Sequence, residues 1–264
     1  MNKVFIELFN KQPNEIIDGV YYYGSEKEGD QFSEKEIEQW SKDGSFEKVF
    51  INGRSLYSKE FNIIAEKVAK FNLPYMEIAC GPGFGLTPFI KNINPSIPAL
   101  ITDACPYIVK YWNEFINRNN YKTNMSFASF DNANMPLKDN SINIITSFLG
   151  IGSTRTAGDD EMNCLNELFR VLKKDGYIFT IENELENYEL VDSIFKDANK
   201  FNYYHNPKVI GTLKERITKA GFTILETYQI GRYVANKDDS YIGELALNQG
   251  KEVAWITSVY IIKK

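Results

Sequence analysis

The chain has 264 residues, of which 43% are apolar and 14% aromatic, enough to bury the core of one large domain or two small ones. Its formal net charge of −5, without a cluster of basic residues, argues against a nucleic-acid partner, because such binding draws its affinity from Lys and Arg. There is no apolar run of about 18 residues and no signal-peptide pattern, so we expect a globular, soluble, cytoplasmic protein without membrane contact.

In residues 1–72 we predict two helices and no strong strand. The first begins near Ser33, where the sequence SEKE has the S-x-x-E form of a capping box. The second begins near Ser58, and its apolar residues recur at helical spacing: Phe61, Ile64, Ala65 and Val68. We therefore interpret residues 1–72 as a helical arm or cap and residues 73–264 as the main domain.

From Tyr75 onward, short apolar runs alternate with helical patterns, which is typical of repeated βα units and a parallel sheet. The predicted strands are 75–80, 98–102, 124–128, 142–147 and 176–182, and the helices between them lie near 84–93, 106–118 and 160–173. A helix near 208–220 ends at Gly221, and two strand-like runs follow at 222–230 and 252–262. Two successive strands imply an antiparallel edge on an otherwise parallel sheet.

The stretch YMEIACGPGFGL, residues 75–86, predicts a binding site for an anionic or nucleotide ligand. An apolar run with one acidic residue ends in three closely spaced glycines before a helix, where backbone N–H groups and the helix dipole can meet a ligand. A dinucleotide site would place its third glycine at position 86, which is Leu86, so the NAD pattern is broken. Asp103, about 20 positions on, suits the ribose hydroxyls of either kind of adenosine cofactor.

Five motifs in order resemble those of class I S-adenosylmethionine-dependent methyltransferases. YMEIACGPGFG is similar to the first motif, ALITDACP to the second-strand motif, and SFDNANMPLKDNSINIITSF to the adenine-binding stretch and fourth strand. ELFRVLKKDGYIFTIE resembles the next helix and fifth strand, and LKERITKAGF with WITSVYIIKK resembles the final helix and strand pair. The resemblance covers residues 73–264 and implies a Rossmann-like, doubly wound α/β fold. Its seven-stranded, mostly parallel sheet would have an antiparallel C-terminal strand and an N-terminal helical extension.

The resemblance also implies a cofactor, S-adenosylmethionine, with S-adenosylhomocysteine as product, and it assigns roles to residues. The glycine loop would hold the methionine end, one acidic residue the ribose, a second acidic residue the adenine edge, and the end of the fourth strand the cofactor floor. The residues of the glycine loop are Glu77, Ala79, Gly81 and Gly83, and those for the ribose are Asp103 and Ala104. Asp131 and Asn132 are assigned to the adenine, and Ser147 and Phe148 to the floor. No metal site is predicted, and we interpret Cys80, Cys105 and Cys164 as apolar packing residues.

Some residues depart from the family pattern, and each also has a simpler explanation. Ala79 stands where the first glycine of the motif usually lies, Glu77 replaces the commoner Asp, and Asn143 replaces an Asp in the fourth strand. Asp103 could instead cap the helix that starts at Pro106, and Asp131 could hold an Asx turn. Two alternatives therefore stay open: an S-adenosylmethionine-binding protein without transferase activity, and a nicotinamide-dependent oxidoreductase.

A methyl transfer from a sulfonium is an in-line displacement that depends on positioning and is favoured by a water-poor, aromatic site. The sequence identifies no catalytic base; His205, the sole histidine, and Tyr204 are candidates, although a loop histidine is more often a surface or hydrogen-bonded residue. The chain lacks the [DN]-P-P-[YF] tetrapeptide, which in this family marks the methylation of nitrogens in nucleic acid and protein. Its absence, together with the acidic charge, favours a small-molecule acceptor. Residues 1–72 and 183–206 would then cover it as a lid. The sequence predicts neither the acceptor nor the oligomeric state.

Overall fold

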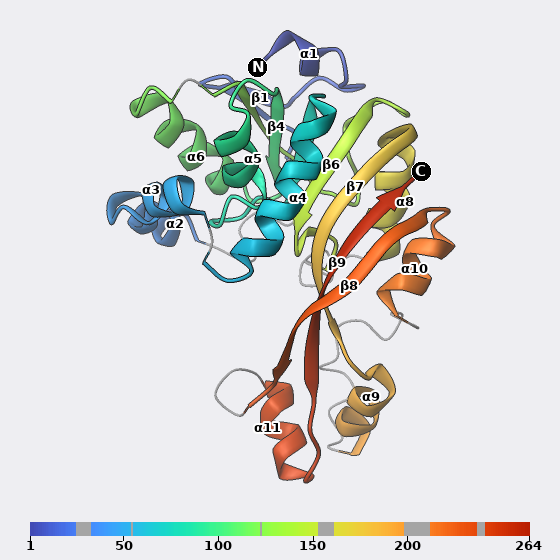
Figure 1. Cartoon of the computed structure of the whole chain (residues 1–264). Coiled ribbons are helices and arrows are strands. Elements are labelled where there is room, and N and C mark those ends of the chain that lie inside the picture. Colours follow the sequence, from blue (N-terminus) through green and yellow to red (C-terminus); the bar gives the residue numbers. More distant parts are fainter. Residues whose placement is uncertain (25–32, 54, 122, 153–160, 198–211, 237–240) are drawn as a thin grey trace.

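The computed structural model describes residues 1–24, 33–53, 55–121, 123–152, 161–197, 212–236 and 241–264. Its strands form one sheet in the order β1-β2-β5-β4-β3-β6-β7-β9-β8, with helices on both faces (Figure 1). The strands are β1 Glu15–Ile17, β2 Val20–Tyr22, β3 Tyr75–Ile78, β4 Ala99–Asp103, β5 Met125–Ser129, β6 Ile142–Phe148, β7 Leu172–Leu185, β8 Thr223–Val234 and β9 Ala254–Lys263.

The centre of the sheet confirms the predicted architecture. Strands β5, β4, β3, β6 and β7 are parallel neighbours, and β9 pairs antiparallel with both β7 and β8. The strands predicted at 75–80, 98–102, 124–128 and 142–147 correspond closely to β3, β4, β5 and β6, whereas β7 is longer than the predicted 176–182. The fold is therefore the expected mostly parallel, doubly wound sheet with an antiparallel C-terminal strand.

The predicted number of seven strands is wrong, because the N-terminal region adds β1 and β2 to the sheet. These strands form a hairpin whose turn places Asp18 and Gly19 in the left-handed region, at φ 51° and 81°. Strand β2 then pairs parallel with β5, with Tyr21 opposite Ala128. Each strand has only three residues and β1 is exposed throughout, so neither shows the apolar alternation by which a strand is predicted.

The helices are α1 Lys3–Ile6, α2 Glu34–Lys42, α3 Ser45–Asn52, α4 Ser58–Phe71, α5 Thr87–Ile93, α6 Pro106–Arg118, α8 Glu161–Val171, α9 Tyr188–Asp197, α10 Leu213–Lys219 and α11 Tyr241–Asn248. The predicted capping box is confirmed, because the Ser33 hydroxyl accepts from the Glu36 N–H and the Glu36 carboxylate accepts from the Ser33 N–H. Helix α4 buries its predicted apolar face of Phe61, Ile64, Ala65 and Val68. None of the helices in the described ranges is long and apolar enough to cross a membrane.

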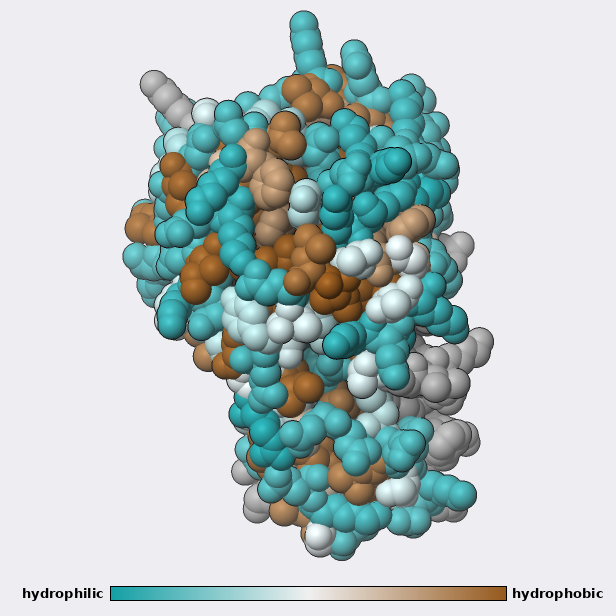
Figure 2. Space-filling model, turned by 45° about the vertical axis from the view of Figure 1, so that its right-hand side comes forward, coloured by the Kyte–Doolittle hydropathy of each residue, from teal (hydrophilic) through white to brown (hydrophobic). Residues whose placement is uncertain are grey.

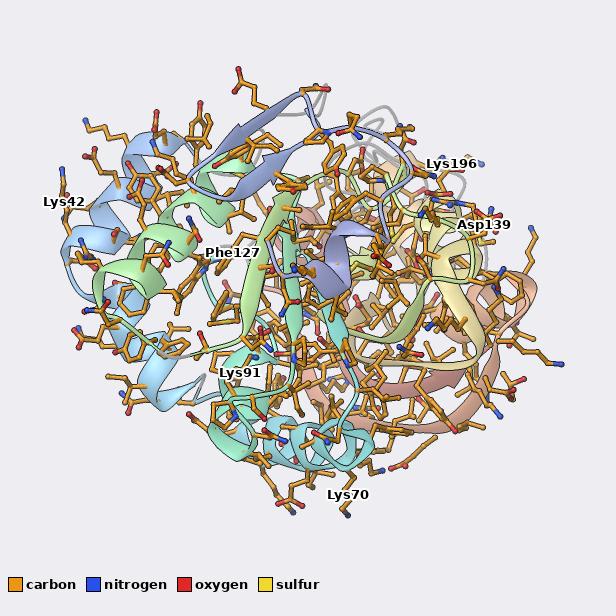
Figure 3. The ribbon with its side chains drawn as sticks, turned by 90° about the horizontal axis from the view of Figure 1, so that it is seen from above. Lys42, Lys70, Lys91, Phe127, Asp139 and Lys196 are labelled. Carbon is orange, nitrogen blue, oxygen red and sulfur yellow. The ribbon has the colours of Figure 1, made fainter. Side chains whose placement is uncertain are left out.

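Each face of the sheet carries its own apolar core. Helices α4, α5 and α6 pack on one face around Trp112 and Phe61, and α8 and α10 pack on the other around Leu165 and Ile217. In Figure 3, Phe127 of β5 lies in the interior, whereas Lys42 and Lys70 lie at the periphery. The sheet is therefore covered on both faces, which leaves the ends of its strands as the place for a site.

Strands β7, β8 and β9 continue as a twisted ribbon away from the body of the molecule, with α9 and α11 at its far end (Figure 1). These helices and the strand ends enclose a small third core: Leu185, Val191, Ile194, Phe195, Ala246 and Val253. Figure 2 shows this part as a narrower lower lobe beneath the body. We call this ribbon with its two helices the extension. The predicted lid segment 183–206 contributes β7 and α9 to it, and residues 198–206 lie outside the described residues.

Candidate functional site

The glycine loop between β3 and α5 is built from left-handed residues. Ala79, Gly81, Phe84 and Gly85 have φ values of 47°, 54°, 56° and 51°. At Gly85 only glycine fits, because a Cβ would lie 2.0 Å from Oε1 of Glu77. At Ala79 an L-residue occupies a conformation that costs about 1–2 kcal/mol, which explains why the family pattern usually has glycine there.

Glu77 holds this loop from the protein side. Its buried Oε2 accepts hydrogen bonds from the Leu86 N–H at 3.2 Å, the Thr87 hydroxyl at 3.2 Å and the Thr146 hydroxyl at 2.7 Å. Burial raises the pKa of this carboxyl to about 7, although the three hydrogen bonds oppose the shift. The side chain therefore fixes the first turn of α5 to β6 beneath the loop.

Asp103, the last residue of β4, is bonded to the same loop from the neighbouring strand. Its Oδ2 accepts from the Gly81 N–H and its Oδ1 from the Cys105 N–H, both at 2.9 Å. Burial raises its pKa to about 6, against the effect of these two bonds. Because each carboxylate oxygen has two lone pairs, both can still accept from ribose hydroxyls. Next to it, the Ala104 carbonyl accepts from the Ser129 hydroxyl, which joins the ends of β4 and β5.

Asp131 and Asn132 form a turn directly after β5. The Asp131 carboxylate accepts from the Ala133 N–H at 2.9 Å, so the Asx turn considered as a simpler explanation is present. Asn132 is buried, and its side-chain oxygen has no hydrogen-bond partner among the described residues. A buried polar atom without a partner at the predicted adenine position fits a site that a polar ligand completes.

The end of β6 forms the other side of the site. The Ser147 hydroxyl accepts from the Gly150 N–H at 2.9 Å, and the ring of Phe148 packs on Phe61 of α4 with centroids 5.1 Å apart. Gly150 in turn faces Ala79, since a Cβ at position 150 would lie 3.1 Å from the Ala79 methyl group. The alanine of the glycine loop is thus accommodated by a glycine in the turn after β6.

Two further residues of the site were missed in the sequence. Glu182 of β7 is buried and accepts from the N–H groups of Ile151 and Gly152, each at 3.1 Å, and burial raises its pKa to about 7. It therefore holds the turn after β6 as Glu77 holds the turn after β3. Trp112 of α6 donates its indole N–H to the Gly81 carbonyl at 2.9 Å. Glu182 could have been found in the sequence, because it is a carboxylate inside a buried strand. Trp112 gave no such signal, because its sequence context is that of an ordinary core residue.

The predicted cofactor residues thus come together at one edge of the sheet. Strands β5, β4, β3 and β6 are adjacent and parallel, so their carboxyl ends present Asp131, Asp103, the glycine loop and Ser147 side by side. From β3 the chain runs outward to β4 and β5, and it then crosses back to β6 on the other side of β3. This reversal is the switch point where open α/β sheets bind ligands. The candidates His205 and Tyr204 lie outside the described residues.

Residues 69–238 match a protein family described as "Methyltransferase domain". The chain therefore belongs to this family and is a class I S-adenosylmethionine-dependent methyltransferase, with S-adenosylmethionine as its cofactor. A comparison with curated proteins finds no match.

Solved structures share the fold at low sequence identity. A protein of Galdieria sulphuraria proposed to be a sarcosine dimethylglycine methyltransferase is 13% identical, with a TM-score of 0.56 over 78% of this chain and 85% of that chain. A proposed methyltransferase of Bacillus halodurans is 15% identical, with a TM-score of 0.53 over 77% and 98%. An arsenic(III) S-adenosylmethionine methyltransferase of Chlamydomonas reinhardtii is 16% identical, with a TM-score of 0.51 over 72% and 63%. At these identities the likeness concerns the fold.

Proposed function

We propose that the enzyme transfers the methyl group of S-adenosylmethionine to a small-molecule acceptor by in-line displacement. The observation that carries the proposal is a contact between the N-terminal region and the C-terminal ribbon. It lies beside the carboxyl ends of the parallel strands, where the predicted cofactor residues come together and which we call the cofactor edge. Tyr57, which precedes α4, contacts Gly231 of β8 and donates a hydrogen bond to Thr257 of β9 at 3.2 Å. A site bordered by an N-terminal helix and a C-terminal ribbon suits a compact acceptor better than a polymer.

The residues described above would bind the cofactor in the predicted way. The loop backbone at Ala79, Gly81 and Gly83 would hold its methionine end and Asp103 its ribose, while the loop is kept in place by Glu77. The turn at Asp131 and Asn132 would hold the adenine, with Ser147 and Phe148 as the floor. When bound, the cofactor supplies an activated methyl group on a positively charged sulfur.

The chain would accelerate the transfer mainly by positioning and by excluding water. Phe148, Phe61 and Tyr57 place aromatic side chains on the α4 face near the end of β6, where a cation–π contact with a sulfonium is favourable. From the acidic charge we infer that the enzyme has no nucleic-acid partner, and the cytoplasmic location stays a prediction. His205 and Tyr204 as bases, and residues 1–72 with 183–206 as a lid, stay predictions.

Transfer of labelled methyl from S-adenosylmethionine tests this proposal. The enzyme would be offered a panel of small amines, thiols, phenols and carboxylates, and in parallel DNA, RNA and a protein mixture. We expect turnover of one small-molecule class, lost in Asp103→Ala. Transfer to a polymer alone would contradict the small-molecule acceptor, and bound cofactor without any transfer would favour a binding protein without transferase activity.

A further inference from the structure

Three positions on neighbouring strands of the extension, two of them polar, form a row beside the cofactor edge. Thr257 of β9 is the register partner of Asn183 on β7 and of Gly231 on β8, so the three share one face. This is the face on which α4 packs, because Tyr57 reaches it from the start of that helix. Asn183 directly follows Glu182, which holds the turn after β6.

The side chains of this row form a directed chain of hydrogen bonds. The Tyr57 hydroxyl donates to Oγ1 of Thr257 at 3.2 Å, and the Thr257 hydroxyl donates to Oδ1 of Asn183 at 2.6 Å. Because Thr257 already accepts from Tyr57, its own proton is directed to Asn183 and selects the amide oxygen as partner. The hydrogen bond from Tyr57 to Thr257 therefore determines the orientation of the Asn183 amide.

Unusual backbone features keep the Tyr57 hydroxyl in place. Tyr57 itself is left-handed, at φ 59° and ψ 24°, a conformation that non-glycine residues seldom adopt. Gly231 is required opposite it, because a Cβ there would lie 2.3 Å from the hydroxyl oxygen. The register of β8 against β9 also shifts between Gln229 and Gly231, as at a β-bulge. Strained residues and bulges cluster at functional sites, where the surrounding structure holds them.

The result is one oriented donor within an apolar wall. Asn183 is half-buried, and its amide nitrogen donates to no described residue, while its oxygen is held by Thr257. The rows before and after it on the same face are apolar or aromatic: Ile181, Val259 and Tyr228 on one side, and Leu185, Trp255 and Tyr233 on the other. Small-molecule sites typically combine such a wall with a few placed polar groups that fix orientation.

We propose that Asn183 is a specificity-determining residue that donates its side-chain N–H to an oxygen of the methyl acceptor. Tyr57 and Thr257 are positioning residues that aim this amide. The acceptor class is then a small molecule with an apolar body and a carbonyl, carboxylate or hydroxyl oxygen beside the atom that is methylated. This inference rests on the proposed function, since it names the acceptor chemistry of the same site.

Matched acceptor pairs test it with the full chain. Each pair shares the nucleophilic atom, and one member adds an oxygen-bearing group, a carboxylate or a hydroxyl: benzylamine and phenylglycine, thiophenol and thiosalicylate, phenol and catechol. For the preferred nucleophile we expect kcat/KM to be at least about tenfold higher for the oxygen-bearing member, as one well-placed hydrogen bond allows. Asn183→Ala should bring this ratio close to one, mainly through KM, with unchanged affinity for S-adenosylhomocysteine.

The positioning residues have their own variants. Thr257→Val removes the hydroxyl and should lower the kcat/KM ratio severalfold. Thr257→Ser keeps the hydroxyl and should keep the ratio of the unchanged protein. Tyr57→Phe should also lower the ratio, because Thr257 is then free to accept from a flipped Asn183 amide. Tyr177→Phe, in the first part of β7 away from the row, is the control and should leave the ratio unchanged.

The outcomes separate this inference from the proposed function. Transfer without preference for the oxygen-bearing member, or a preference that survives Asn183→Ala, would overturn the role of Asn183 and leave the methyltransferase proposal standing. A preference lost in Asn183→Ala but retained in Thr257→Val would overturn the positioning chain. Failure to transfer to any member would instead contradict the proposed small-molecule acceptor, and the role of Asn183 would fall with it.

Discussion

The indole N–H of Trp112 donates to the carbonyl oxygen of Gly81 at 2.9 Å, which ties helix α6 to the glycine loop. The same indole stacks on Phe84 of that loop, with ring centroids 4.0 Å apart, and on Phe46 of α3 at 4.2 Å. Gly81 is thus held from both sides, since its N–H donates to Asp103. The conformation of the loop proposed to hold the cofactor therefore depends on a core residue that has no place in the sequence motif.

Trp112→Phe should weaken cofactor binding without unfolding the protein. Phenylalanine keeps part of the stacking on Phe84 but cannot donate to the Gly81 carbonyl, so a hydrogen bond worth about 0.5–1.5 kcal/mol is lost. We expect affinity for S-adenosylhomocysteine to fall by about two- to tenfold in a calorimetric titration. Trp40→Phe, on α2, is the matched control. Equal affinity in both variants would show that the indole bond does not organise the loop.

Ala79→Gly should stabilise the protein. Ala79 is left-handed at φ 47°, and glycine adopts this region without the steric penalty, so we expect the free energy of unfolding in urea to rise by about 1 kcal/mol. Gly150→Ala should do the opposite, because its methyl group would lie 2.4 Å from the Ser147 hydroxyl oxygen and 3.1 Å from the Ala79 methyl group. A destabilised Ala79→Gly variant would mean that the alanine methyl contributes packing that outweighs its backbone strain.

The stability of the protein should fall as the pH rises from about 4.5 to about 7. Glu77 and Glu182 have pKa values of about 7 in the folded state, raised by burial from an ordinary 4.5. In this range the folded state retains protons that the unfolded chain releases, so increasing pH favours unfolding. Each carboxyl should account for about 1–3 kcal/mol of the decrease.

Urea unfolding at several pH values between 4 and 8 measures this dependence. Glu77→Gln and Glu182→Gln should each flatten the curve, because the amide does not titrate. The amide oxygen can still accept from the Leu86 N–H at position 77, and from one of the two N–H groups of Ile151 and Gly152 at position 182. Glu66→Gln, at a group on the surface of α4, should leave the slope unchanged. A slope that both buried-site variants leave intact would mean that these two carboxyls are not its source.

The sequence predicted the central sheet well because its strands depend on local patterns, and the structure brings the predicted cofactor residues together at one edge of that sheet. The strands β3 to β6 are buried apolar runs bounded by turn residues, and the glycines of the loop are needed at left-handed positions such as Gly81 and Gly85. Asp103 was predicted because its spacing from the loop follows from one βα unit. These features lie within short stretches of chain and leave a direct mark on the sequence.

The missed features depend on contacts between distant residues. The β1–β2 hairpin has too few residues for an apolar alternation, and its place beside β5 follows from tertiary pairing. Glu182 and Trp112 act on loops more than 25 residues away in the chain, and α11 packs against α9 in a small separate core. The hydrogen-bond chain of Tyr57, Thr257 and Asn183 joins three regions that no spacing rule connects.

The most direct test of the cofactor site is a calorimetric titration of the purified protein with S-adenosylmethionine, S-adenosylhomocysteine and NAD, alongside the Asp103→Ala variant. The account predicts binding of the first two ligands with micromolar dissociation constants, no binding of NAD, and loss of binding in the variant, because Asp103 orders Gly81 and is the residue proposed to hold the ribose. Binding of NAD, or undiminished binding of S-adenosylhomocysteine by the variant, would contradict the site described.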